Sequence, residues 1–177
     1  MSDPRSPAPL TAASLAVWRA EVSAALSAVT HGFEEKYGYT PGENAVRPPE
    51  PDDRAAARRL AAESPAFADL AVFYGEIGAV GMSDVGNGYF LHSGARALLE
   101  RVDLPDPGTD ATVPAVLIGS DGGGILYAVG PDGGVWRSRT ASEEGEFDRI
   151  TDGLAEFLDL LRRSVHRFNE SGRPGFV

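Results

Sequence analysis

The sequence predicts an α+β domain, in which N-terminal helices and a C-terminal helix pack on an antiparallel-rich sheet. Apolar residues recur every three or four positions over about 13–36 and again over about 152–168, as on one face of a helix. Between these segments, glycine-rich turns separate short apolar runs over 115–139, which is typical of an antiparallel meander. Helices, then strands, then a helix is the order expected of an α+β fold.

The N-terminal part divides into three expected stretches. Residues 1–11 are rich in Pro, Ala and Ser and are expected to be disordered. A helix over about 13–36 follows and ends at Gly38, and its apolar positions are Leu15, Trp18, Val22, Leu26, Val29 and Phe33. Four prolines between residues 40 and 53 then predict a linker or an extended arm that wraps the fold. We therefore expect a helix and a proline-rich arm over 12–53, separate from a main domain over 54–170.

The first half of that main domain begins with two helices. A short alanine-rich helix is expected over about 53–62, and Ser64-Pro65 is a typical start for the next helix, with its C-terminal end at residues 75–78. Strands are expected over 77–82 and 89–92. Between them Asn87-Gly88 is a strong signal for a tight hairpin turn. Ser93 is expected to cap a helical turn that ends near Leu99.

The second half contains the meander. Residues 103–114 are polar and are expected to form a loop, and strands are expected over 115–119, 125–129 and 135–139. An edge strand over 147–150 and the helix over 152–168 complete the domain, and residues 171–177 are expected to be a loose tail. Glycine permits a positive φ and a close approach of another backbone, so we expect structural roles for Gly119, Gly122, Gly123, Gly124, Gly133 and Gly134, as for Asn87 and Gly88.

The charge of the chain predicts a protein partner. The net charge is −10, and between Asp69 and Asp132 nine acidic residues face only Arg96 and Arg101. A field of this sign repels phosphate backbones, so we expect no direct binding to nucleic acid. The same field favours association with a basic protein.

Composition argues against several kinds of chemistry. The chain has no cysteine, which excludes disulfides, thiolate catalysis and cysteine-ligated zinc. Its three histidines lack the spacing of a metal site, and neither a Walker motif nor a G-x-G-x-x-G fingerprint occurs, so no cofactor is expected. Apolar stretches are far shorter than the ~18 residues of a membrane span, and the start lacks the apolar core of a signal peptide. We expect a cytoplasmic protein that does not bind membranes.

Ser120 is the residue most easily mistaken for a nucleophile. It lacks the G-x-S-x-G frame, and a strand follows it where a nucleophile elbow needs a helix. A serine in such a place is more often a turn residue that bonds to its own backbone. A small hydrolase that uses Ser120 and His92 stays as a disfavoured alternative.

Four segments resemble the SUKH superfamily. They are Phe73–Gly78, Asn87–His92, the Ile118–Gly124 turn with the strand Leu126–Val129, and Leu154–Leu158 at the start of the last helix. The resemblance covers about residues 65–165, and the Gly-Ser-Asp-Gly-Gly-Gly turn at 119–124 is its most specific part. The superfamily contains bacterial immunity proteins of polymorphic toxin systems and a fungal regulator of cell-wall synthesis.

The resemblance implies an α+β fold without catalytic residues. It implies an immunity-type protein that binds and neutralises a cognate toxin, such as a nuclease or another basic protein. A regulatory or scaffold module of the same fold, bound to an endogenous protein, is the runner-up. The oligomeric state stays open. The residues we expect at the partner surface are Asp84, Asp121, Asp132, Trp136, Glu143 and Glu144.

Overall fold

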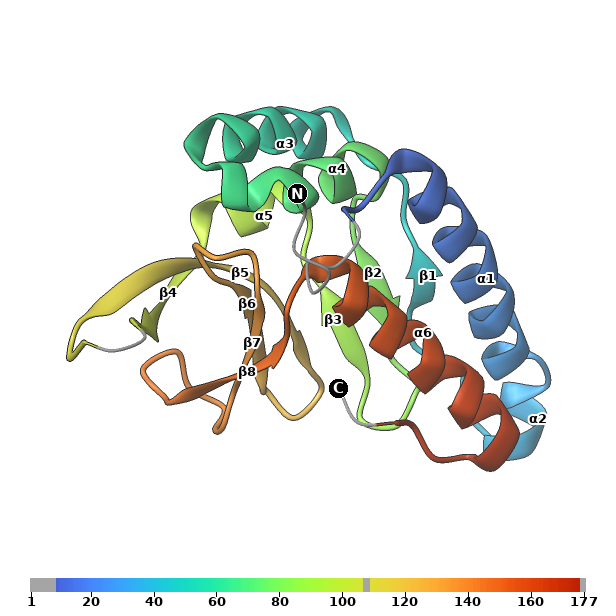
Figure 1. The fold of residues 1–177 in the computed structure, drawn as a ribbon. Helices are drawn as coiled ribbons and strands as arrows, with labels where there is room; N and C mark the ends of the chain where they lie inside the picture. Colours follow the sequence, from blue (N-terminus) through green and yellow to red (C-terminus); the bar gives the residue numbers. More distant parts are fainter. Residues whose placement is uncertain (1–8, 107–108, 176–177) are drawn as a thin grey trace.

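The computed structural model describes residues 9–106 and 109–175, and it confirms the α+β class (Figure 1). The helices are α1 (Ala12–Thr30), α2 (Phe33–Tyr37), α3 (Pro51–Glu63), the 3-10 turn η1 (Pro65–Phe67), α4 (Ala68–Glu76), α5 (Gly94–Leu99) and α6 (Leu154–Ser171). The strands are β1 (Asn44–Val46), β2 (Val80–Met82), β3 (Tyr89–Leu91), β4 (Arg101–Pro105), β5 (Thr112–Asp121), β6 (Leu126–Val129), β7 (Val135–Ser138) and β8 (Phe147–Thr151).

The strands form one antiparallel sheet in the order β1-β2-β3-β5-β6-β7-β8, with β4 also paired to β5. Strand β5 is long enough to pair with β4 through its first half and with β3 through its last three residues. A β-bulge between Leu117 and Gly119 interrupts its pairing with β6. Because an extra residue in one strand reverses the alternation of side chains, the bulge decides which residues at the end of β5 face the helices.

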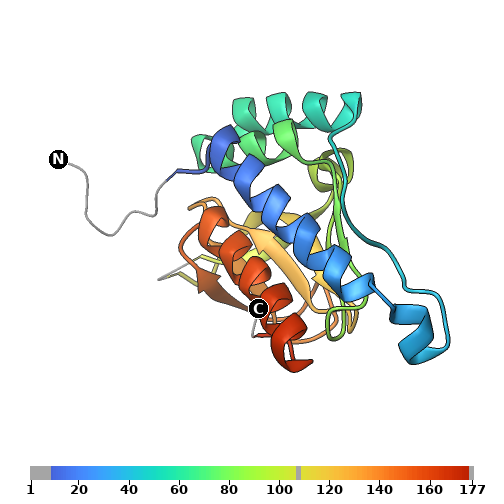
Figure 2. The same ribbon diagram turned by 90° about the vertical axis from the view of Figure 1, so that its right-hand side faces the viewer.

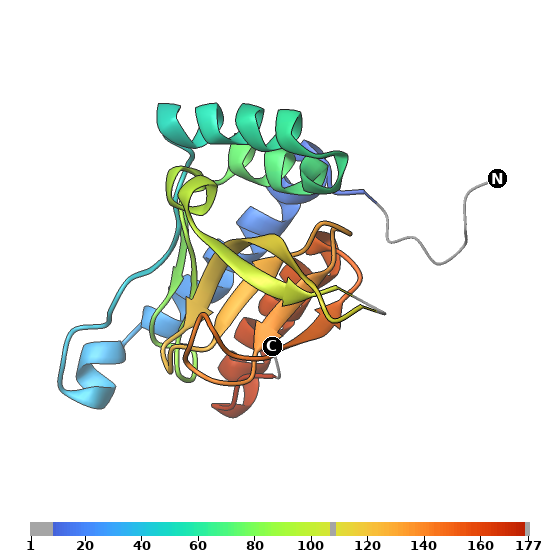
Figure 3. The same ribbon diagram turned by 90° about the vertical axis from the view of Figure 1, so that its left-hand side faces the viewer.

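Helices cover one face of the sheet. Helices α1 and α6 lie side by side against it, and α3, α4 and α5 gather at one end (Figures 1 and 2). The main core lies beneath them and includes Trp18, Leu60, Phe73, Ile118 and Phe157. Strands β4–β8 present their other face on the side away from α1 and α6 (Figure 3). A smaller cluster on that face consists of Val102, Leu104, Ala115, Leu117, Ala128 and Phe147.

The expected boundary near residue 53 does not divide this structure. Helix α1 shares the main core with α4 and α6, and the Trp18 indole N–H donates a 2.7 Å hydrogen bond to the Leu158 carbonyl. Strand β1 comes from the proline-rich arm and pairs with β2. The extended arm was predicted, but its separation from the domain is corrected: one core unites both parts.

The start of α1 also differs from the expectation for residues 1–11. Leu10 is buried and its backbone N–H donates to Asp69, while Thr11 caps the helix through a capping box with Ser14. A capping box stabilises a helix start, so Leu10 and Thr11 belong to the folded part. Residues 1–8 lie outside the described residues.

The predicted first helix is in fact two helices. Helix α1 ends at Thr30 and α2 begins at Phe33, because Gly32 between them has a φ of 64°, which breaks the right-handed helix. The two helices ending at Glu63 and Glu76, the turn capped by Ser93, the meander and β8 lie within a few residues of their predicted positions.

The predicted loop over 103–114 is wrong at both ends. Strand β4 occupies 101–105, and β5 begins at Thr112. Val102 and Leu104 are buried while Asp103 and Pro105 are exposed, which is the alternation of a strand with one face in water. Residues 107 and 108, between the strands, lie outside the described residues.

The C-terminal segment is more ordered than the expected loose tail over 171–177. Ser171 belongs to α6, and Gly172, with a φ of 69°, ends the helix. Pro174 packs against Gly86, where an added Cβ atom would lie 2.5 Å from the proline ring. The described tail residues therefore cover the turn between β2 and β3, and residues 176 and 177 lie outside the described part.

Candidate functional site

The turn between β2 and β3 meets the turn after β5 at one end of the sheet, and glycine makes the contact possible. The Gly122 N–H donates to the Gly88 carbonyl at 3.1 Å, and a Cβ atom at residue 122 would overlap the Asn87 carbonyl oxygen. Gly88 and Gly124 have positive φ values, of 87° and 85°. The predicted role of these glycines, a close approach between backbones, is confirmed by this geometry.

The other turn glycines divide by role. Gly119 lies against the Phe90 carbonyl, where a Cβ atom would clash, and Gly134 lies against the Arg149 guanidinium in the same way. Gly133 has a φ of 80° in the turn between β6 and β7, whereas Gly123 combines an ordinary φ with no close neighbour under 3.3 Å. The hairpin predicted at Asn87 exists, but Asn87 itself has no positive φ.

Two of the acidic residues expected at the partner surface also stabilise turns at this end. Asp84 accepts hydrogen bonds from the Gly42 N–H at 2.8 Å and from the Asn44 side chain at 2.6 Å, which ties the proline-rich arm to the sheet. One oxygen of Asp121 accepts the N–H groups of residues 123 and 125. These carboxylates therefore already have structural partners, and their role at a partner surface stays a prediction.

Asp132 and Trp136 lie apart from that end. Asp132, in the turn between β6 and β7, accepts the Gly134 N–H at 3.1 Å and forms an ion pair with Arg149. Trp136 is partly buried and packs on the smaller cluster. The structure therefore does not join these two residues to Glu143 and Glu144 in one surface.

Glu143 and Glu144 line a groove of about 950 Å³ between the β4–β5 hairpin and the loop over 139–146. Asp103 and Asp110 lie on its other side. None of these four carboxylates forms an ion pair with any described residue. The groove thus holds four carboxylates without a basic partner.

The two arginines of the groove have partners. Arg101 pairs with Glu63 at 2.9 Å, and Arg139 pairs with Glu146 and with Asp148. The hydrogen bond from Arg139 lowers the pKa of the Asp148 carboxyl below its ordinary value. Because both guanidinium groups are neutralised locally, the groove keeps a negative surface, and we define it as the acidic groove.

Sequence reasoning missed half of the acidic groove. The sequence predicts a loop over 103–114, which contains Asp103 and Asp110 and gives no reason to place them beside Glu143 and Glu144. The alternation of Val102 and Leu104 with polar residues was the signal that could have revealed β4.

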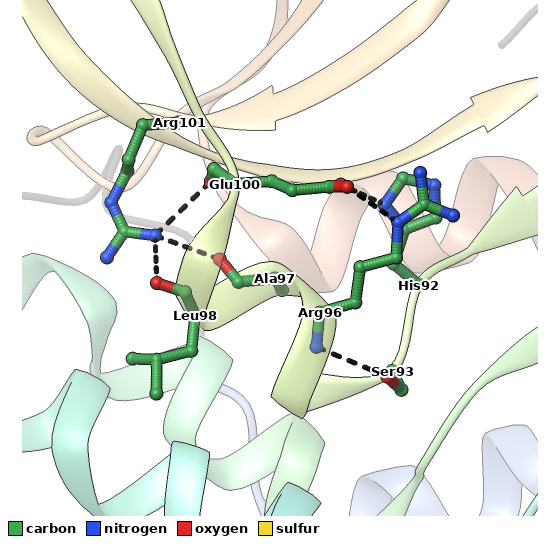
Figure 4. Close-up of polar contacts among 7 residues, drawn as sticks. All are labelled: His92, Ser93, Arg96, Ala97, Leu98, Glu100 and Arg101. Carbon is green, nitrogen blue, oxygen red and sulfur yellow. Dashed lines mark hydrogen bonds and ion pairs between the residues drawn. The ribbon is translucent and has the colours of Figure 1, made fainter.

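His92 and Ser120 do not form a catalytic pair in this structure. Ser120 lies opposite Phe90 in the β3–β5 ladder, whereas the His92 N–H donates to the Ile118 carbonyl at 2.8 Å. The His92 side chain points to Glu100, with 3.1 Å between Nδ1 and Oε2 (Figure 4). Among the hydrogen bonds of the described residues, none joins the His92 side chain to Ser120, although a general base and its nucleophile require one.

The surroundings of His92 suit a neutral imidazole. Its side chain is 7% exposed. Burial lowers the pKa of His92 below its ordinary value, the charge of Arg96 lowers it further, and Glu100 opposes both. Arg96 pairs with the other Glu100 oxygen at 2.8 Å, and Arg101 donates to the carbonyls of α5 (Figure 4). The cluster anchors α5 to β4, which is a structural task.

Within residues 9–106 and 109–175, no three His, Asp or Glu side chains are grouped so as to hold a metal ion. No helix in that part of the chain is both long enough and apolar enough to cross a membrane.

Comparisons with models of protein families, with curated proteins and with solved structures found no match. The resemblance to the SUKH superfamily therefore stays a prediction.

Proposed function

We propose that this chain is a non-enzymatic, immunity-type protein, which acts in the cytoplasm by binding and neutralising a basic protein toxin through the acidic groove. The observation that carries the proposal is the set of four carboxylates without ion-pair partners, two on each side of that groove. The antiparallel meander resembling SUKH proteins and the net charge of −10 support the same reading.

The groove suits a protein better than a small molecule. It is open, and its walls come from the β4–β5 hairpin on one side and the loop over 139–146 on the other. Unpaired carboxylates at an open surface raise the rate at which a basic partner arrives, and they disfavour acidic partners. A nuclease toxin fits this requirement, since its substrate-binding surface must itself be positive to hold phosphates.

The partner need not be a toxin for the groove to work. A basic endogenous protein would use the same carboxylates, and the chain would then be a regulatory module. The hydrolase alternative finds less support, because Ser120 and His92 share no hydrogen bond. The experiment below separates the two binding functions by its protection assay.

The test is co-expression with the product of the neighbouring gene, read out as protection of the host and as a complex in size-exclusion chromatography. Replacing Glu143 and Glu144 by Gln removes two charges from the groove and should weaken the complex about tenfold or more, chiefly through slower association. Raising the salt concentration should weaken the wild-type complex for the same reason.

The matched control replaces Glu34 and Glu35 of α2, which are exposed and form no ion pair with any described residue. This variant loses the same net charge, so it should bind as the wild type does. If both double variants weaken the complex equally, general charge and not the groove is responsible. A complex without protection favours the regulatory module. The absence of both a complex and protection would refute the proposal.

A further inference from the structure

Strand β4 has one edge that no other described strand covers. It pairs with β5 along one side only, and it lies at the margin of the sheet, far from α1 and α6 (Figure 1). The same strand forms one wall of the acidic groove, where Arg101, Val102, Asp103 and Pro105 line it. An open sheet edge presents backbone N–H and C=O groups that can pair with a further strand, so β4 is a place where another chain can be added to this sheet.

The hydrogen bonds of the ladder show which backbone groups of β4 are open. The Leu117 N–H donates to the carbonyl of Glu100, the residue before β4 begins. Hydrogen-bonded pairs in an antiparallel ladder recur at every second residue, so Val102 and Leu104 also bond to β5. The backbone groups of the odd-numbered residues of β4 therefore point away from β5.

These outward groups form no hydrogen bond with any described residue. The N–H groups of Arg101 and Asp103 have no acceptor, and the carbonyls of these two residues and of Pro105 have no donor. Val102 and Leu104, between them, are buried in the smaller cluster, which holds the strand extended. A partner strand would thus meet an edge that is already ordered, and preorganisation lowers the entropic cost of binding.

The charges beside this edge indicate which kind of strand fits it. Asp103 is exposed on β4, and the four carboxylates of the acidic groove lack ion-pair partners among the described residues, whereas Arg101 is paired with Glu63. Opposite charges on neighbouring strands stabilise their pairing, and like charges destabilise it. A second copy of this chain would bring its own Asp103, its own Pro105 without an N–H, and a net charge of −10. Charge complementarity therefore favours a basic strand over a second copy.

We propose that the basic partner places an extended segment in the acidic groove as an added strand beside β4, with Lys or Arg side chains next to Asp103. This proposal rests on the function proposed above, because the segment belongs to the same basic partner. It adds the secondary structure of the bound segment and the backbone groups that hold it. In recognition of this kind, hydrogen bonds between main chains provide affinity and the flanking side chains select the sequence.

The experiment uses the full chain and a short synthetic peptide of alternating Lys and Val, with hydrogen exchange of backbone amides measured by NMR. We expect slower exchange at Arg101 and Asp103 when the peptide is bound, because their N–H groups gain an acceptor. The amides of Val102 and Leu104 already donate to β5, so their exchange should change little. A peptide of alternating Glu and Val should not bind, because the carboxylates of the groove repel it.

Two N-methylated forms of the Lys-Val peptide separate strand pairing from attraction between charges. One form carries a methyl group on the backbone nitrogen of each Lys, and the other on that of each Val, so both keep the same charges. A strand donates to one neighbour from alternate residues only. One form should therefore bind as the parent peptide does, and the other at least about tenfold more weakly.

Variants of β4 test the edge in the protein itself. Asp103→Asn removes the charge and keeps the outward N–H, so it should weaken binding of the Lys-Val peptide about two- to fivefold. Asp103→Pro removes both, and should weaken binding about fivefold further, since an edge strand tolerates proline where its N–H faces away from the sheet. Pro105→Ala adds an outward N–H and should strengthen binding several-fold, a gain that tests the edge even if Asp103→Pro fails to fold.

Strand addition would be overturned if the Lys-Val peptide fails to bind, if it binds without slowing exchange at Arg101 and Asp103, or if both methylated forms bind equally. An unchanged affinity in Pro105→Ala would also contradict it. A stable dimer of the free chain that Asp103→Pro dissociates would assign the edge to a second copy instead. None of these results refutes the proposed function, because a toxin can bind the acidic groove through side chains alone; only the co-expression experiment decides that.

Discussion

The indole N–H of Trp18, in the first helix, donates a 2.7 Å hydrogen bond to the carbonyl of Leu158, in the last helix. The two residues are 140 positions apart, and Trp18 is 7% exposed. This bond is buried, so it joins the ends of the chain within the main core. The N-terminal helix therefore folds as part of the same unit as the rest of the chain, and the stability of the protein should depend on this contact.

The first prediction is that Trp18→Phe lowers the free energy of unfolding by about 2–3 kcal/mol. Loss of a buried hydrogen bond accounts for about 1 kcal/mol, and the cavity left by the smaller ring accounts for the rest. Denaturant titration measures the change. Val17→Ala is the control: Val17 is 58% exposed, and its loss should cost under about 0.5 kcal/mol. Equal stability of Trp18→Phe and the wild type would mean that the indole and its hydrogen bond to Leu158 contribute no net stability.

The second prediction concerns Gly122, whose backbone meets the Asn87 carbonyl. In Gly122→Ala the new methyl group would overlap that oxygen, so one of the two turns must move. We expect a loss of about 1–3 kcal/mol, as for other overpacked sites, and a broken hydrogen bond to Gly88. Thermal unfolding gives the first quantity, and amide hydrogen exchange at residue 122 gives the second.

Gly75→Ala is the matched control for that variant. Gly75 lies in α4, and a Cβ atom there would meet nothing within 4 Å. Alanine favours a helix over glycine, so this change should stabilise the protein by about 0.5–1 kcal/mol. If Gly75→Ala raises the free energy of unfolding and Gly122→Ala lowers it, the close contact at residue 122 accounts for the difference. A stabilised Gly122→Ala variant would refute the close approach.

The sequence pattern is sufficient to predict the helices and strands whose apolar residues are regularly spaced. The apolar residues of helix α6 recur with a period of 3.6, and the sequence predicts this helix. The strands of the meander are apolar runs between glycine-rich turns, and the sequence predicts them as well. Gly32 ends α1 within a continuous apolar stripe, so periodicity alone could not show the break. Strand β4 was missed because the prolines, aspartates and glycine over 105–110 favour a loop, and they outweighed the short alternation of Val102 and Leu104 with polar residues.

The site residues depend on register, which single-residue patterns do not reveal. Glu143 faces Asp103 across the acidic groove only because β4 folds back on β5. Tyr127 and Arg137 flank one short hairpin, so their pairing could have been derived from the turn at 130–134. The bulge in β5 inserts one residue between Leu117 and Gly119, and nothing in the run of apolar residues marks its place.

The third prediction is a pH dependence caused by His92. The pKa of His92 is lowered in the folded protein by burial and by Arg96, against the opposing effect of Glu100. Between that lowered pKa and the ordinary value of about 6.5, the unfolded chain binds a proton that the folded chain does not. The contribution of His92 to the free energy of unfolding should therefore be fully present above about pH 6.5, and stability should fall as the pH decreases through this range.

Denaturant titrations above and below that range, on wild type and on His92→Gln, measure this contribution. The variant should lose stability at neutral pH, yet show a smaller decrease on acidification than the wild type. His31→Gln, at an exposed position outside the cluster, should keep the wild-type slope. The same slope in His92→Gln and wild type would assign the acid sensitivity to other groups.

The fourth prediction is that Tyr74→Phe stabilises the protein. Tyr74 is 0% exposed, and its hydroxyl has no hydrogen-bond partner among the described residues. Burial raises the pKa of Tyr74 above its ordinary value, and the charges of Asp53 and Glu100 raise it further, so the hydroxyl stays neutral and its desolvation is uncompensated.

Removing an unsatisfied buried hydroxyl should raise the free energy of unfolding by about 1 kcal/mol, because the ring contacts stay and the desolvation penalty disappears. Denaturant titration measures the difference, with Tyr37→Phe as the control, since the Tyr37 side chain is 45% exposed and should contribute nothing. A loss of about 1 kcal/mol in Tyr74→Phe would instead show that the hydroxyl has a partner, such as a buried water molecule. The buried ring could then no longer be treated as an apolar part of the core.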